Sequence, residues 1–255
     1  MSVVSRISQV LIFVGIVVTS KKKYKLLIFF VALMSVNSVL SRDCVVLLHG
    51  LARVSNSMGE LEAKLTRADF FVANINYLSR KHHIDFLSHD AVSRGIQDCL
   101  EVKSEKIHFV THSLGGILVR YFFKERNLQN LGRVVMLGPP NQGSELVDRL
   151  KSVPGFSLLG PTGMRLGTDA DSILRELGPV SYEVGVIAGT RNITPLGFFF
   201  LDRPNDSVVT VESTKVKGMR DHMVLPVTHT FMMRNNKVID HSINFLRFGF
   251  FIRED

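Results

Sequence analysis

The stretch Ile107-His108-Phe109-Val110-Thr111-His112-Ser113-Leu114-Gly115-Gly116 decides the fold. Its first four residues are mostly apolar, which is typical of a buried parallel strand, and apolar side chains recur at helical spacing after Ser113. A serine at a sharp strand-to-helix turn has strained dihedral angles, so the residues two positions away have to be small. Gly115 satisfies this requirement, whereas Thr111 stands where the strict motif has glycine. This pattern predicts a turn that presents the Ser113 hydroxyl; an ordinary serine at a helix N-cap is the alternative that this stretch alone leaves open.

Strand-like and helix-like segments alternate on both sides of this turn. We expect strands at residues 44–48, 70–75, 107–110, 133–137, 183–188 and 219–225, and helices at residues 57–67, 89–100, 114–123 and 238–248. Such alternation forms a mostly parallel sheet flanked by helices, with right-handed crossovers. The predicted fold class is therefore α/β, with a single domain over residues 42–255.

A second informative segment precedes the serine by several elements. The apolar run at residues 45–48 ends in His49-Gly50, and the chain then turns back over the carboxyl edge of the predicted sheet. The backbone N–H groups of Leu51 and Leu114 are thereby expected to converge on one oxygen atom, as in an oxyanion hole. Taken alone, Gly50 is equally well explained as a turn glycine. We expect His49 to make a structural hydrogen bond.

Three motifs together resemble a known family. Leu47-Leu48-His49-Gly50-Leu51, Thr111-His112-Ser113-Leu114-Gly115-Gly116 and Gly138-Pro139-Pro140-Asn141-Gln142-Gly143-Ser144 look like those of bacterial lipase-like and esterase-like α/β hydrolases. The resemblance extends from about residue 43 to residue 248. It implies the α/β-hydrolase fold and a serine enzyme that cleaves carboxylic esters without a cofactor, with Ser113 as the nucleophile.

A serine nucleophile needs a base, and the base needs a group that orients it. In this fold the order along the chain is serine, acid, histidine. We choose Asp206 as the acid over Asp202, because residues 203–213 resemble the family's acid loop, where an aspartate follows asparagine and precedes an apolar run. Similar proteins usually have glycine where this chain has Ser207.

His229 is our choice for the base, because it follows the last predicted strand and precedes the last predicted helix. His222 falls inside that strand, where a structural role is expected. His241 falls in the middle of the helix, where a surface position is expected. The predicted catalytic set is thus Ser113, Asp206 and His229, with Leu51 and Leu114 as oxyanion donors.

Residues 138–181 contain repeated glycine and proline and limit the size of any lid. Helical pieces are expected at residues 144–150 and 171–177, since a parallel strand follows and needs a crossover connection. Only residues 153–168 then remain to cover the serine, so the lid should be small or absent. Phe198–Phe200, inside a predicted loop at residues 189–205, should either line an acyl pocket or belong to the core.

Charge and composition exclude several other classes of protein. The net charge of +8 is concentrated in residues 1–41, which contain five Lys and Arg residues and no Asp or Glu. No basic run is interleaved with aromatic residues, so we expect no nucleic-acid partner.

The sequence also lacks the motifs of a metal or nucleotide site. The histidines and aspartates at residues 82–90 lack the ligand spacing of a metal site, and no phosphate-binding or dinucleotide-binding glycine pattern follows a strand. An ester or lipid-like small molecule is the expected partner.

The N-terminus has the pattern of a secretory signal. A basic block at residues 21–25 precedes an apolar run at residues 26–34 and a small-residue stretch at residues 35–41. We expect residues 1–41 to be a signal peptide or an N-terminal membrane anchor of an exported or envelope-associated protein, and translation to begin downstream of Met1, at Val17 or Val18. Cys44 and Cys99 are either joined in a disulfide or both buried as thiols.

Other activities fit the same motifs. An acyltransferase would use the same three residues with an alcohol as acceptor, and an amidase or thioesterase would use them on another acyl bond. A catalytically silent binding module of the cell envelope, built on a hydrolase scaffold, is the alternative from another class of protein.

Overall fold

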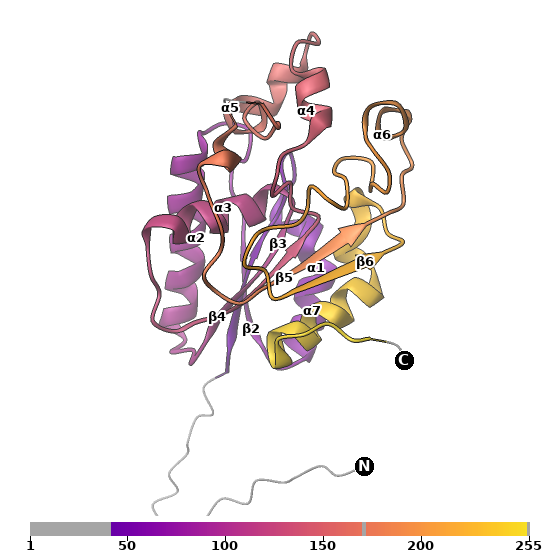
Figure 1. Ribbon diagram of the computed structural model, residues 1–255. Coiled ribbons are helices and arrows are strands. Elements are labelled where there is room, and N and C mark those ends of the chain that lie inside the picture. The colour runs from indigo at the N-terminus through magenta and orange to yellow at the C-terminus, as the bar shows by residue number, and fades with distance from the viewer. Residues whose placement is uncertain (1–41, 170–171, 254–255) are drawn as a thin grey trace, which may run out of the picture. The chain divides into compact units, whose positions relative to one another are not determined.

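A parallel sheet lies at the centre of the molecule, as Figure 1 shows. The computed structural model describes residues 42–169 and 172–253, and across these residues six strands lie in the order β2-β1-β3-β4-β5-β6, each parallel to its neighbours. Their bounds are β1 Cys44–Leu48, β2 Phe71–Ile75, β3 Ile107–His112, β4 Leu131–Leu137, β5 Val184–Gly189 and β6 Asp221–Leu225. The predicted parallel α/β architecture is confirmed.

Helices cover both faces of this sheet (Figure 1). α2 (Ile84–Glu101) and α3 (Leu114–Glu125) pack on one face, and α1 (Gly59–Arg67) and α7 (Asn236–Phe248) pack on the other. Successive side chains of a strand point to opposite faces, so Val46 and Leu48 join the first apolar core while Val45 and Leu47 join the second. Burial on both faces explains why the strands are continuous apolar runs.

The order of the strands places a crevice at one edge of the sheet. The chain adds β2 on one side of β1 and then crosses to add β3 on the other side. In open parallel sheets, ligands bind outside the carboxyl ends of the strands where the winding direction reverses. Here that point lies between the ends of β1 and β3, where Gly50 and Ser113 follow their strands.

The connection from β4 to β5 differs from its prediction. α4 (Glu145–Leu150) forms as expected, followed by the short turns η2 (Phe156–Leu159), α5 (Gly160–Gly163) and η3 (Ile173–Arg175). The helix expected at residues 171–177 is wrong, because only one 3₁₀ turn forms before Gly178, whose φ is +63°, and Pro179. A segment this short cannot offset the cost of helix nucleation, and the chain crosses over through short turns instead.

The loop expected at residues 189–205 contains a helix, α6 (Pro195–Phe200). Thr194 caps it, since its hydroxyl accepts a hydrogen bond from the N–H of Gly197 at 3.1 Å. Pro195 occupies the first helical position, where the missing N–H costs nothing. Other boundaries also shift. α2 begins five residues earlier than expected, the 3₁₀ turn η1 (Ser55–Met58) precedes α1, and the strands, α3 and α7 differ from their expected ranges by at most two residues at either end.

A disulfide joins Cys44 of β1 to Cys99 of α2, which decides between the two alternatives for the cysteines. Both residues are fully buried in the first core. Within the described ranges, no helix has the length and apolar character needed to cross a bilayer. The expected signal or anchor at residues 1–41 lies outside the described residues.

Candidate active site

Ser113 occupies a strained turn between β3 and α3. Its φ and ψ angles are 51° and −117°, in a region that residues other than glycine rarely adopt. α3 crosses β1 so closely that a Cβ atom at Gly115 would lie 2.5 Å from the carbonyl oxygen of Leu48. Thr111 fits despite its departure from the strict motif, because Gly116 leaves room for its hydroxyl, which donates to the carbonyl of Val135. The geometry is that of the predicted turn, not of an ordinary N-cap.

Leu51 and Leu114, the predicted oxyanion donors, directly follow Gly50 and Ser113 at the ends of β1 and β3. Leu114 begins α3, so its N–H is one of the first-turn donors that have no partner inside the helix. Among the described residues, neither this N–H nor that of Leu51 has a hydrogen-bond partner. A Cβ at Gly50 would lie 2.7 Å from Nδ1 of His112 and 3.2 Å from Cβ of Ser113, so only glycine lets this turn approach the serine.

His49 has the structural role that its position predicts. Its Nδ1 donates to the carbonyl of Gly50 at 2.9 Å, and its Nε2 accepts from the N–H of Tyr77 at 3.3 Å. The two rings are stacked with centroids 4.0 Å apart. Burial lowers the pKa of His49, which keeps the ring neutral and the turn after β1 fixed.

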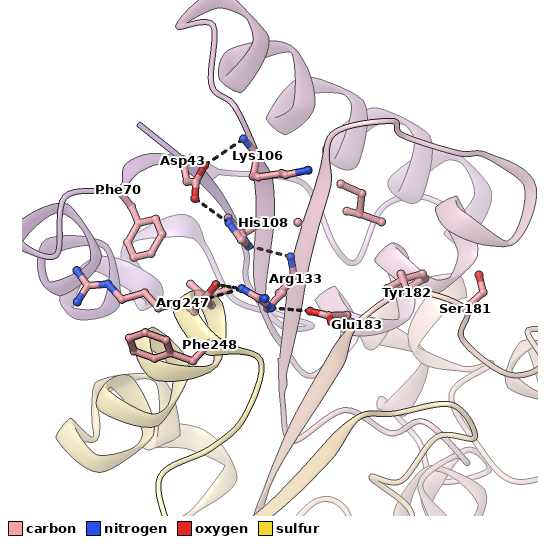
Figure 2. Close-up of a pocket in the computed structure, with 13 residues that line it drawn as sticks. Asp43, Phe70, Lys106, His108, Arg133, Ser181, Tyr182, Glu183, Arg247 and Phe248 are labelled. Carbon is pink, nitrogen blue, oxygen red and sulfur yellow. Dashed lines mark hydrogen bonds and ion pairs between the residues drawn. The ribbon is translucent and has the colours of Figure 1, made fainter. Parts of the chain in front are cut away.

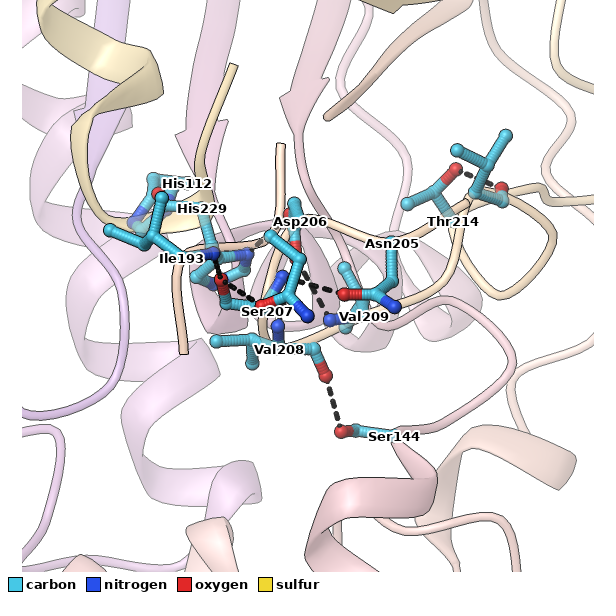
Figure 3. A network of polar contacts seen from close by, with 12 residues as sticks. His112, Ser144, Ile193, Asn205, Asp206, Ser207, Val208, Val209, Thr214 and His229 are labelled. Carbon is cyan, nitrogen blue, oxygen red and sulfur yellow. Dashed lines mark hydrogen bonds and ion pairs between the residues drawn. The ribbon is translucent and has the colours of Figure 1, made fainter. Parts of the chain in front are cut away.

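Asp206 and His229 are in direct contact, as Figure 3 shows. The carboxylate of Asp206 accepts a hydrogen bond from Nδ1 of His229 at 2.8 Å, which leaves Nε2 as the unprotonated nitrogen. The N–H of His229 also donates to the backbone carbonyl of Asp206 at 3.0 Å. The acid therefore fixes both the tautomer and the backbone of the histidine.

The buried carboxylate of Asp206 is satisfied on its other side as well. Oδ1 accepts hydrogen bonds from the N–H groups of Val208 (3.0 Å) and Val209 (2.9 Å), in a tight turn of the chain (Figure 3). These bonds compensate for the burial of the ionised group. Asp202 is exposed and lies near Glu145, where the two negative charges contribute to a raised pKa of Glu145, whose main cause is burial.

The other two candidate histidines lie elsewhere. Nε2 of His222 is 3.0 Å from the hydroxyl of Thr214, which agrees with the expected structural role. His241 is half-buried, because its ring packs edge-on against Phe251. The expected surface position of His241 is therefore wrong, since the chain after α7 folds back over it.

Ser113 and His229 meet in a pocket of about 280 Å³ at the carboxyl edge of the sheet. Leu51 also lines it, and its remaining walls are mainly apolar. They are formed by side chains of α4, η2, the segment after α5 and the acid loop: Leu146, Val147, Phe156, Leu159, Leu166, Val208 and Val209. In the part of the chain that the structure describes, no direct hydrogen bond joins Ser113 to His229. Such bonds often tighten only when substrate is bound.

His112 is a site residue that the sequence reasoning did not single out. Its Nε2 donates to the backbone carbonyl of His229 at 3.0 Å, and the two rings lie 4.8 Å apart. Burial, reinforced by the neighbouring His229, lowers its pKa well below 6.5. The signal was present in the sequence, because a histidine directly before the serine of a strand-to-helix turn must lie at the same edge of the sheet.

The block at residues 138–144 also supports the site. Gly138 has a φ of +53°, and a Cβ there would lie 3.1 Å from Nδ1 of His229 and 3.2 Å from Oδ2 of Asp206. The hydroxyl of Ser144 donates to the carbonyl of Val208 at 2.7 Å (Figure 3). Arg120 of α3 holds the middle of the block through the backbone and side-chain oxygens of Asn141. The third family-like motif therefore connects the serine helix to the acid loop.

A larger hollow of about 720 Å³ lies at the opposite, amino-terminal edge of the sheet (Figure 2). His108 lies at its centre, where Nδ1 accepts from the N–H of Arg133 and Nε2 faces Asp43. Glu183 pairs with Arg133. None of the predicted catalytic residues lines this hollow, so it is not the candidate active site. In residues 42–169 and 172–253, no three potential metal ligands come together, and His82 packs against Phe86.

Comparison with known proteins identifies the fold. No family model and no curated protein sequence matches the chain. The mature lipase BlEst2 of Bacillus licheniformis is similar in structure, with a TM-score of 0.62 and 20% identity, over 77% of this chain and 89% of that one. The esterase EaEST of Exiguobacterium antarcticum has a TM-score of 0.60 and 14% identity, over 81% and 92% of the two chains.

The phospholipase PlaB of Legionella pneumophila gives a TM-score of 0.56 at 21% identity, over 79% of this chain and 57% of that one. This chain thus spans little more than half the length of PlaB. These likenesses, together with the strained serine turn, show that the chain has the α/β-hydrolase fold that its motifs predict.

Proposed function

We propose that the protein is a serine hydrolase that cleaves carboxylic esters, with Ser113 as nucleophile, His229 as base and Asp206 as the group that orients the base. The hydrogen bond between His229 and Asp206, beside a serine in a strained turn that opens into the same pocket, supports this function. It supplies the tautomer of His229 that can accept a proton at Nε2.

In the first half of the reaction, Nε2 of His229 takes the proton of the Ser113 hydroxyl as Oγ attacks the carbonyl carbon of the ester. The tetrahedral intermediate carries a negative oxygen, which the N–H groups of Leu51 and Leu114 stabilise; each such donor contributes about 3–4 kcal/mol to lowering the barrier. The intermediate collapses, the bond to the alcohol oxygen breaks, and His229 gives its proton to the departing alcohol.

In the second half, water attacks the acyl-enzyme. His229 takes a proton from the water, the oxyanion forms again at the same two amides, and the carboxylic acid leaves as the proton returns to Oγ of Ser113. Each of these steps uses side chains and amides of this chain together with water.

The walls of the pocket favour an apolar acyl group. Leu146, Val147, Phe156, Leu159 and Leu166 face the space next to Ser113. The structural neighbours named a lipase, an esterase and a phospholipase agree with an ester or lipid-like substrate. We therefore infer that the acyl chain of the substrate lies between α4 and η2.

A fluorophosphonate probe combined with p-nitrophenyl esters of rising acyl length tests this function. The wild-type protein should react with the probe at Ser113 and hydrolyse the esters, and Ser113→Ala should do neither while keeping its thermal unfolding transition. Labelling at another residue, or turnover by Ser113→Ala above a few per cent of wild type, would reject the assignment.

We infer also that residues 42–255 form the catalytic domain and that residues 1–41 direct it to an oxidising compartment outside the cytosol. The signal-like order of residues 21–41 and the disulfide between Cys44 and Cys99 support export. Cell fractionation followed by N-terminal sequencing of the recovered protein tests both points, and a cytosolic protein with an intact N-terminus would contradict them.

A further inference from the structure

Three consecutive phenylalanines of α6 face solvent. Phe198, Phe199 and Phe200 are 56%, 81% and 40% exposed, and none of them lines the pocket at Ser113. Both expectations from the sequence, an acyl-pocket wall and a core segment, are therefore wrong. Ile193 and Leu196 on the same segment are also exposed. Because soluble proteins rarely expose contiguous apolar patches of this kind, these five residues, which we call the α6 patch, point to a binding surface.

The α6 patch lies beside the mouth of the candidate active site. α6 packs against α4, and α4 supplies Leu146 and Val147 to the pocket wall. Figure 1 shows α4, α5 and α6 rising from the same end of the sheet. Leu158 of η2, the turn that supplies Phe156 and Leu159 to the pocket wall, is also highly exposed. A flat apolar phase that contacts the α6 patch would therefore face the pocket.

Hydrogen bonds join α6 and the residues before it to the loop that carries Asp206. The side-chain amide of Asn205 donates to the carbonyl of Gly197 at 3.2 Å. The hydroxyl of Ser207 accepts from the N–H of Ile193 at 2.8 Å, as Figure 3 shows. A Cβ at Gly197 would lie 2.8 Å from Cα of Ser207, so the two backbones are in close contact. The phenylalanines are thus presented by a fixed element, held by the two neighbours of Asp206.

Two arginines flank the α6 patch. The guanidinium of Arg203 lies over the ring of Phe198 at 3.8 Å, and Arg191 lines a hollow of about 340 Å³ together with Ile193 and the exposed Phe231. Residues 189–201 contain no Asp or Glu; the exposed Asp202 follows this segment, and its charge lies near that of Glu145 of α4. Exposed aromatic and aliphatic side chains flanked by arginines are the chemistry that binds an anionic lipid surface.

We propose that the α6 patch docks the protein on an anionic lipid surface, with the phenylalanines inserted among the acyl chains and Arg191 and Arg203 at the headgroups. The proposal of a docking surface depends only on the exposed residues. The further statement, that docking presents surface-held esters to Ser113, rests on the proposed function.

The absence of tryptophan from the sequence allows a direct test. Phe199→Trp creates a single fluorescent reporter in the α6 patch, and Phe250→Trp creates a matched one at a residue that is 55% exposed. Phe250 packs against Phe248, which lines the hollow at the opposite edge of the sheet. Both reporters are placed in the full chain carrying Ser113→Ala, so that the lipids are not hydrolysed. Vesicles of phosphatidylglycerol and brominated phosphatidylcholine are then added.

We expect the emission of Trp at position 199 to shift to the blue and to be quenched by the brominated chains, while the reporter at position 250 is unchanged. This reports on α6 itself, whatever else in the chain binds lipid. Vesicles of phosphatidylcholine alone should bind more weakly, because they lack the negative headgroups. An unquenched reporter at position 199, equal quenching at both positions, or no vesicle binding would overturn the proposal, and a protein partner for α6 would then be the explanation to pursue.

A second pair of variants separates docking from chemistry. Phe198→Ser with Phe199→Ser should weaken binding to the anionic vesicles about tenfold or more, since two apolar side chains are lost. Hydrolysis of soluble p-nitrophenyl butyrate should stay at the wild-type rate, because neither residue lines the pocket. Unchanged vesicle affinity rejects the docking surface. If the probe does not label Ser113 in the wild-type protein, the proposed function is rejected, while the proposal of a docking surface is unaffected.

Discussion

The backbone carbonyl of His229 accepts a hydrogen bond from Nε2 of His112, the residue directly before Ser113. The candidate base is therefore held to the strand that carries the candidate nucleophile. Nδ1 of His112 is buried without a hydrogen-bond partner, and burial lowers the pKa of the ring well below 6.5. His112 consequently stays neutral in the folded protein near neutral pH.

This pKa shift predicts how stability changes with pH. Above about pH 6.5 the ring is neutral in both the folded and the unfolded chain, so its contribution is constant. As the pH falls below 6.5, His112 binds a proton in the unfolded chain but stays neutral in the folded protein. The free energy of unfolding therefore decreases. Thermal melts between pH 8 and pH 5 should show this decline, and His112→Gln should reduce its slope. The exposed residue His83 provides the control, and an equal slope in His112→Gln and His83→Gln would contradict the assignment.

The choice of acid predicts unequal effects of two conservative substitutions. Asp206→Asn removes the acceptor for Nδ1 of His229 and favours the wrong tautomer, so kcat should fall by about three to four orders of magnitude. Asp202→Asn changes an exposed side chain outside this network and should leave kcat within about twofold of wild type. Ester hydrolysis by both variants decides the matter. A comparable loss in Asp202→Asn would mean that the acid is wrongly assigned.

Gly138 is expected to matter for chemistry as well as for folding. A methyl group there would press on both Nδ1 of His229 and Oδ2 of Asp206, and the φ of +53° adds strain of about 1–2 kcal/mol. Gly138→Ala should therefore lower kcat about 10–100-fold by misplacing the base. Gly178 has a similar φ of +63°, and no atom lies within 4 Å of the place that an added methyl group would take, so Gly178→Ala tests strain alone. If both variants keep full kcat, the close contact at Gly138 has no catalytic consequence.

Ser207 occupies a backbone conformation that suits glycine, with a φ of 93°. Its hydroxyl compensates, because it donates to Asn192 at 2.9 Å and accepts from the N–H of Ile193. Ser207→Ala keeps the strain and loses both bonds, so the free energy of unfolding should fall by about 1–3 kcal/mol. Ser207→Gly loses the same bonds and relieves the strain, and should be more stable than Ser207→Ala by about 1 kcal/mol. Urea titration of the three proteins would show whether this order holds.

The short turns between α4 and η3 predict simple kinetics on soluble esters. α5 is four residues long and η2 is a single 3₁₀ turn, which is too little to close an amphipathic lid over Ser113. The rate of hydrolysis of a short-chain ester should therefore follow a saturation curve through its solubility limit. A sharp increase at that limit would mean that residues 153–168 move much further than their structure indicates.

The sequence was sufficient to predict the elements that are buried on both faces. β1 is predicted to the residue, because Cys44–Leu48 is a continuous apolar run between polar residues. The neighbourhood of Asp206 and His229 follows from the order of serine, acid and histidine together with the family resemblance, and the structure places the two side chains in contact. Their catalytic role is still a prediction.

Short segments were harder to predict, because tertiary contacts decide them. The apolar residues at positions 173, 174 and 177 suggest a helix. In the structure a single 3₁₀ turn is enough to place the first two of them in the core. The exposure of Phe198–Phe200 depends on Asn205 and Ser207, which fix α6 from outside its own sequence. The position of His112 before Ser113 places it at the edge of the sheet that holds the site, but its partner His229 is 117 positions away, and no local pattern indicates that contact.

The disulfide between Cys44 and Cys99 uses the only two cysteines of the chain. The folded protein therefore has no sulfhydryl group for alkylating agents, nitrosating agents or soft metals to attack. Serine-directed and thiol-directed inhibitors should therefore act differently on this protein. Under the proposed function the first react with Ser113, while the second have no target until the disulfide is reduced. Loss of activity on treatment with a thiol reagent would thus reveal a population in which the bond never formed, and so serves as an assay of the compartment in which the chain folded.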